Sequence, residues 1–164
     1  MRPTRSERGA GTSLGHVAYT SAEARQELLD SLASAIDQIG LGLAALGAAY
    51  EQLDEHNADR LEAELFGPVQ VAYGRAKSAH AQFADRYGFP RRTFEAASPG
   101  LPSTGAKGFI DSAVQAVTET DSILAALQDS GLPAEVGDVE VRSAISDVRA
   151  LLGGVRQHAR ALGR

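Results

Sequence analysis

The side chains that could do chemistry in this chain are four histidines and a short run of carboxylates. A di-metal carboxylate site in a helical protein needs a glutamate three residues before an inward-facing histidine, because these two positions share one helix face. None of the four histidines, which are His16, His56, His80 and His158, has such a glutamate. The nearest set of possible metal ligands is Asp54, Glu55, His56 and Asp59. This set lies in a polar segment where solvated side chains are expected, so we expect no bound metal.

Nucleophilic and phosphate-binding sites are also absent from the sequence. The chain has no cysteine, which excludes thiol catalysis, disulfides and cysteine-ligated zinc. Gly40 and Gly42 lie within an apolar helical stripe and follow no strand, so they do not form a phosphate-binding loop. No serine lies in a nucleophile-elbow context. The sequence therefore predicts a protein that is not an enzyme and needs no cofactor.

One histidine and three aromatic residues could still line a ligand pocket. His80, in the segment RAKSAHAQFADR, lies at or beside an apolar stripe and is interpreted as a boundary histidine of the core. A small ligand bound between helices would contact the larger side chains nearby. The candidate pocket residues are Tyr50, Tyr73, His80 and Phe83.

Length and composition indicate one globular domain. The chain has 164 residues, of which 43% are hydrophobic and 23% charged, and a formal net charge of −5. The acidic charge argues against nucleic-acid binding by the whole surface. The most apolar window, 39–50, is about half of the ~20 residues needed to span a bilayer, and no apolar segment follows the basic N-terminus. We therefore expect a cytoplasmic protein that does not contact membranes.

The first half of the chain predicts a long helical hairpin. Residues 1–19 show no periodicity and are expected to be a flexible tail, and Thr20 and Glu23 have the spacing of a capping box. A helix is predicted from 21 to 54 or 55, with its apolar positions alternating by three and four residues. These positions are Leu29, Leu32, Ile36, Ile39, Leu43, Leu46, Tyr50 and Leu53.

A turn at 55–58, capped by Asn57, is expected to lead into a second helix that ends at Gly88. The alternative is one helix through residue 66 with the turn at Gly67-Pro68, because Pro68 lacks a backbone donor. A connection rich in proline, glycine and serine follows at 88–104.

Two further helices are predicted at 105–129 and 139–162, the latter capped by Asp138. We therefore expect an all-α fold in which residues 20–164 form one antiparallel up-down-up-down four-helix bundle. The first two helices would be about 50 and 45 Å long and the last two about 36 Å, at 1.5 Å per residue. This difference leaves part of the N-terminal hairpin for a partner or a second copy to cover.

Charges segregate if the helices alternate in direction. The basic positions, which we expect at one end, are Arg75, Lys77, Arg86, Arg91, Arg92, Arg156 and Arg160. Acidic residues near the two turns would gather at the other end. Such an arrangement complements helix dipoles and could also bind an acidic partner.

The sequence favours a non-catalytic adaptor or scaffold that binds a protein partner or itself. One alternative is a small-ligand sensor that uses the inter-helix pocket. Another is a small subunit of a nucleoprotein complex that uses the basic end.

Overall fold

The computed structural model describes the backbone of residues 2–100 and 105–162, and the side chains of residues 21–100 and 105–161. The described segments contain helices and no strand, which confirms the prediction of an all-α fold. The helices are α1 (Arg2–Tyr50), α2 (Glu55–Leu61), the π-helix η1 (Glu62–Phe66), α3 (Gly67–Tyr87), α4 (Gly105–Asp129), α5 (Leu132–Glu135) and α6 (Val139–Leu162).

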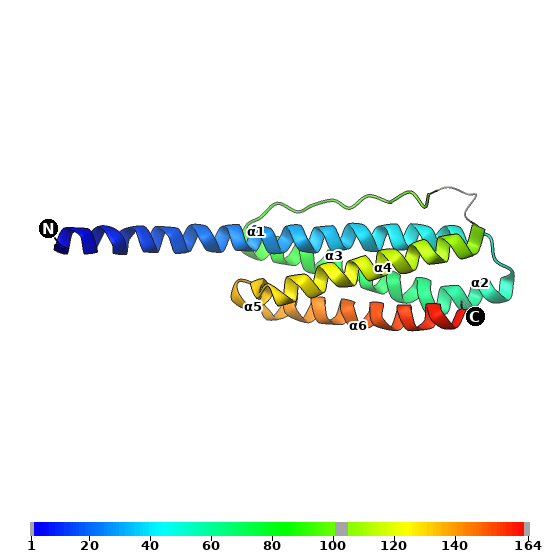
Figure 1. Ribbon diagram of the computed structural model, residues 1–164. Helices are drawn as coiled ribbons and strands as arrows, with labels where there is room; N and C mark the ends of the chain where they lie inside the picture. Colours follow the sequence, from blue (N-terminus) through cyan, green and yellow to red (C-terminus); the bar gives the residue numbers. More distant parts are fainter. Residues whose placement is uncertain (1, 101–104, 163–164) are drawn as a thin grey trace.

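The first helix begins much earlier than the sequence predicts. α1 runs from Arg2 without interruption, so residues 2–19 are helical rather than a flexible tail, and no helix begins at Thr20. Extending an existing helix adds one hydrogen bond for each residue that is fixed, so a helix can continue beyond the segment that packs against others. Figure 1 shows this first part of α1 projecting past the other helices.

The first turn lies at 51–54, slightly before the predicted position. Asp54, rather than Asn57, caps α2, because the Asn57 backbone N–H donates to the Asp54 side chain at 2.9 Å. The alternative turn at Gly67-Pro68 is wrong, since α2, η1 and α3 follow one another without a break. The π-helical turn η1 directly precedes Pro68, and the Gly67 N–H donates to the Glu62 carbonyl. A π-helical turn is wider than an α-helical turn, and it lets the helix continue although Pro68 cannot donate a backbone hydrogen bond.

Contacts between the four long helices give their directions. Arg25, near the start of the packed part of α1, lies over the Tyr87 ring at the end of α3, and Gly40 lies beside Tyr73. α1 and α3 are therefore antiparallel. Gly42 of α1 lies beside Ala113 and Ala116 of α4, whereas Arg25 donates to the Val136 carbonyl beyond the end of α4. α1 and α4 are thus antiparallel as well.

The predicted up-down-up-down order is therefore wrong. Since α3 and α4 each run antiparallel to α1, they run parallel to each other (Figure 1). α6 returns antiparallel to both, as its ion pairs with each show: Asp147 with Arg75, Asp138 with Arg86, and Arg149 with Asp121. The helices are directed up, down, down and up.

The connection after α3 makes this order possible, because it runs along the length of the molecule. It starts at Gly88, which ends α3 in the left-handed conformation (φ 77°), as the sequence predicts. Arg92 then contacts Asp37 of α1 at 2.9 Å, and Pro99 and Gly100 lie in a hollow beside Leu41. The described part of the connection therefore follows α1 in the direction of α1 (Figure 1).

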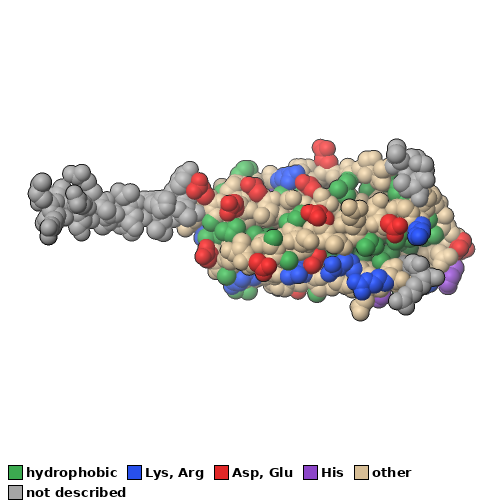
Figure 2. Space-filling model, in the orientation of Figure 1, with side chains coloured by type: hydrophobic (Ala, Val, Ile, Leu, Met, Phe, Trp, Pro, Cys, Tyr) green, Lys and Arg blue, Asp and Glu red, His purple; other side chains and the backbone are tan. Residues whose placement is uncertain are grey.

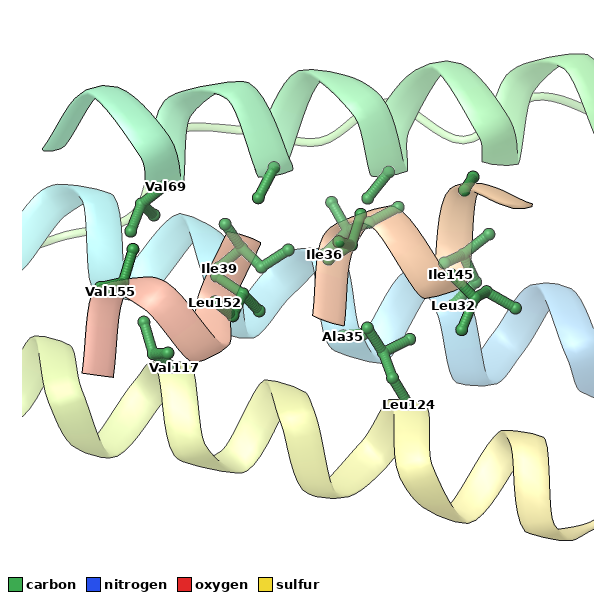
Figure 3. Packing of buried hydrophobic residues seen from close by; sticks show 14 of the residues in the cluster. Leu32, Ala35, Ile36, Ile39, Val69, Val117, Leu124, Ile145, Leu152 and Val155 are labelled. Carbon is green, nitrogen blue, oxygen red and sulfur yellow. The ribbon is translucent and has the colours of Figure 1, made fainter. Parts of the chain in front are cut away.

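A nearly aliphatic core lies between the four long helices. Figure 3 shows its central layers, in which Ile36 and Ile39 of α1 face side chains from α4 and α6. Most of the predicted apolar positions of α1 are buried, but Tyr50 is 37% exposed and Ala49 is buried in its place. The last two helices have the bounds that the sequence predicts, and Asp138 caps α6 by accepting from the Val141 N–H at 2.9 Å.

Candidate functional site

The seven predicted basic residues do not form one basic end. Arg86 lies at the end of α3, near the beginning of α6, and Arg91 and Arg92 lie in the connection that follows α3. Arg156 and Arg160 lie near the end of α6, which runs antiparallel to α3, and so they are at the opposite end of the molecule. Figure 2 shows acidic and basic side chains interspersed over one face of the molecule. The prediction of a basic pole fails because it assumed alternating helix directions.

Most of these cations are also neutralised by a neighbouring carboxylate. Arg86 contacts Asp138 at 2.6 Å, Arg75 contacts Asp147 at 3.2 Å, and Arg156 contacts Asp121 at 3.6 Å. Arg91 pairs with Asp85 and Arg92 with Asp37, and the Lys77 amine lies over the Tyr73 ring. Burial raises the pKa of the Asp138 carboxyl. Hydrogen bonds from Arg86 and from the Val141 backbone lower this pKa by more than burial raises it, so it lies below the usual 3.8. Most of these ion pairs join one helix to another or the connection to a helix.

The four residues predicted to line an inter-helix pocket are not brought together. Phe83 and His80 are buried in α3, Tyr73 lies beside Gly40, and Tyr50 is exposed at the far end of α1. Among them His80 borders a cleft, of about 540 Å³, that is formed with α1 and the connection. The four residues therefore do not line one pocket, and His80 alone among them borders a cleft.

His80 is buried at the boundary of the core, as predicted, but its hydrogen bonding is incomplete. The side chain is 4% exposed, and its Nδ1 has no hydrogen-bond partner among the described residues. The imidazole packs edge to face with Phe94 of the connection, with ring centroids 5.4 Å apart. Burial and the nearby Arg92 lower the pKa of His80, while Asp30 and a hydrogen bond with the Leu29 backbone act in the opposite direction.

A larger and more apolar hollow lies at the other end of the molecule. Toward the beginning of α4, this helix diverges from α6 (Figure 1). Side chains of α2, α4 and α6 line a groove of about 940 Å³ there. We call it the end groove. It is lined by Leu53, Asn57, Leu61, Ala106, Lys107, Ile110, Asp111, Val114, Thr118, Arg156, Ala159 and Arg160.

The end groove follows α4 for three helical turns. Ala106, Ile110, Val114 and Thr118 are spaced by four residues and share one face of α4, which makes the groove about 18 Å long at 1.5 Å per residue. Leu61 and Ala159 are buried at its floor, whereas Ile110 and Val114 remain half-buried. A mostly apolar stripe of this length that borders an unfilled hollow among the described residues is typical of an interaction surface.

Three cations border this apolar surface. Lys107 belongs to α4, and Arg156 and Arg160 are one turn apart on α6, while Asp111 is the one carboxylate of the lining. Arg156 is held by Asp121, but within the described part of the chain neither Lys107 nor Arg160 makes an ion pair. The groove is thus locally basic in a chain of net charge −5.

The sequence singled out some of the groove residues but not the groove. Leu53 was assigned to the buried apolar stripe of the first helix, and Arg156 and Arg160 to a basic end. The available signal was the greater length of the first hairpin, because the first turn and α2 extend this hairpin and supply Leu53, Asn57 and Leu61.

The described residues contain no group of three histidine or acidic side chains that could hold a metal ion. The segment Ser21–Tyr50 is long and apolar enough to cross a membrane, but half of its apolar window is buried against other helices, as in a core helix. Comparison with known protein families, with curated proteins and with solved structures finds no match to this chain.

Proposed function

We propose that this protein is a non-catalytic interaction module, built as a four-helix bundle, that binds a helical segment of a partner protein in the end groove. The observation that carries the proposal is the open apolar stripe of α4, which extends over three turns between α2 and α6. An adaptor or scaffold subunit needs such a surface and no catalytic group.

The dimensions of the end groove suit a helix lying on it. About 940 Å³ spread over a length of about 18 Å leaves a cross-section of about 50 Å². A helix about 10–12 Å across has a cross-section of about 80–110 Å², so one stripe of its side chains would enter while its backbone stays outside. This is the helix-in-groove mode, in which apolar residues at i, i+4 and i+7 are the anchors.

The other two functions are less well supported. A small amphiphilic ligand would fit a volume in the range of about 300–1,000 Å³ that ligand pockets have, and this remains the second candidate. Burial of such a ligand would require walls on all sides, whereas the end groove is open. A nucleoprotein role is disfavoured because the basic residues are divided between two ends and mostly paired.

Site-specific photo-crosslinking in the native host tests the proposal. A photoreactive residue replaces Asp111 or Thr118, both exposed on the rim of the end groove, and Val71 provides a matched position on α3, which is 60% exposed and outside the groove. We expect the first two positions to give the same adduct and Val71 to give none. The Ile110→Glu variant should abolish the adduct while leaving the helical circular dichroism unchanged.

The identity of the adduct decides between occupants. The crosslink should map to an amphipathic helical segment of another protein. A crosslink between two copies of this chain would show that a second copy, rather than another protein, occupies the end groove. Equal labelling from Val71 and from the groove, or none from any position, would show that the end groove is not a docking site.

A further inference from the structure

We infer that the partner helix which occupies the end groove is acidic at one end, with carboxylates that meet Arg160 and Lys107. This inference rests on the proposed function and adds the chemistry of the partner. It is argued from the charges on the two walls of the groove.

Two of these cations lie outside the core. Arg160 and Lys107 are exposed on the rim, and within the described residues neither makes an ion pair. They lie at the same end of the groove, because Lys107 is in the first turn of α4 and Arg160 is in the last turn of α6, whereas Arg156 contacts Asp121 at the other end. A partner with carboxylates there gains charge complementarity, and a basic helix is repelled.

The two cations of α6 differ in what they offer a partner. Arg156 is held by Asp121, which lies beyond Thr118 on α4, so its charge is already neutralised. Arg160 lies one turn further along α6, at the same end of the groove as Lys107. The carboxylates of the partner would therefore meet Arg160 and Lys107, and its apolar anchors would follow toward Val114.

Asp111 limits how far the acidic part of the partner can extend. It lies one turn from Lys107 toward the interior of the groove and would repel a carboxylate placed over the second turn of α4. The acidic residues of the partner are therefore concentrated at one end of its helix. This polarity fixes the direction in which the helix binds.

Fluorescence anisotropy with two labelled peptides tests the inference on the full chain. Both peptides have about 16 residues, slightly more than the groove length requires, and carry leucines at i, i+4 and i+7. The acidic probe has three glutamates at one end, and the basic probe has lysines at the same positions. We expect the acidic probe to bind about tenfold or more tightly than the basic one at low salt, and the difference to shrink as salt is raised.

Charge reversal provides the matched comparison. The double variant Lys107→Glu and Arg160→Glu changes two exposed rim residues and should reverse the preference, so that the basic probe binds more tightly. Lys77→Glu, which removes a cation on α3 outside the groove, should leave the preference unchanged.

The outcomes separate the inference from the proposed function. Equal binding of both probes, abolished by Ile110→Glu, would overturn the acidic partner while supporting the apolar docking site. Failure of both probes to bind would also overturn the inference, and the crosslinking result would then decide the function alone. Saturable binding of decanoate in place of either peptide would overturn both, in favour of a small amphiphile.

Discussion

Replacing His80 by leucine should stabilise the protein, and the gain should grow as the pH falls. In the wild type the imidazole is 4% exposed with an unpartnered Nδ1, and a buried polar group without a partner costs about 1–3 kcal/mol. Leucine removes this cost but also removes the hydrogen bond with the Leu29 backbone, worth about 0.5–1.5 kcal/mol. We therefore expect the free energy of unfolding at pH 8 to rise by about 1 kcal/mol, which is the difference between the middle values of these two ranges.

The pH dependence follows from the lowered pKa of His80. Between its folded pKa and the usual 6.5, the unfolded chain binds a proton that the folded protein does not. The stability of the wild type must then fall as the pH is lowered through this window. Arg92 in the connection disfavours the protonated imidazole and Asp30 of α1 favours it, and burial is the larger effect. His80→Leu removes this dependence.

Urea unfolding followed by circular dichroism at pH 8, 7, 6 and 5 measures both effects. His158→Gln is the matched control, because His158 is an exposed histidine of α6, and it should leave the slope of stability against pH unchanged. A stability difference between wild type and His80→Leu that is the same at pH 5 and pH 8 would refute the reasoning. The protection factors for hydrogen exchange in residues 88–100 should fall at pH 5 in the wild type alone, since Phe94 of the connection packs on His80.

Three further substitutions test the packing. Gly47→Ala should raise the free energy of unfolding by about 1 kcal/mol, because an added Cβ meets nothing within 4 Å and alanine favours the helix; urea denaturation measures it. Leu152→Ala, in the fully buried core, should cost about 2–5 kcal/mol in the same assay. Asp121 has its pKa lowered, chiefly by Arg149, so its stabilisation is present at neutral pH and is lost as the pH falls through the folded pKa. Asp121→Asn should cost about 1–2 kcal/mol at pH 7 and flatten the acid limb of the stability curve below about pH 4.

Local sequence signals predicted most of the helices correctly. The bounds of α4 and α6, the left-handed Gly88 and the cap at Asp138 all depend on side chains within a few residues of the feature. The errors at the start of α2 and at Pro68 also have causes within a few residues. Asp54 competed with Asn57 as the cap of α2, and a π-helical turn allowed the chain to continue through Pro68.

The path of the connection between the two hairpins was not predictable from the pattern of residues. A connection of about seventeen residues can either join neighbouring helix ends or run the whole length of the molecule, and the two paths differ little in loop entropy. Contacts such as Arg92 with Asp37 and Phe94 with His80 join residues far apart in the sequence, so they exist only once the helices have packed.

The sequence by itself determined which of the packed segments are helical and which face of each is apolar, because these properties repeat with the period of a helix. The helix at 2–19, which shows no such period, was not predicted. Tertiary structure alone decided which helix ends meet. That choice separated Arg86 from Arg156, paired most of the basic residues, and left Lys107 and Arg160 beside an open apolar stripe of α4. The reason is that charges and apolar stripes form a site only through neighbours, and the neighbours were set by the direction in which α4 returns along α1.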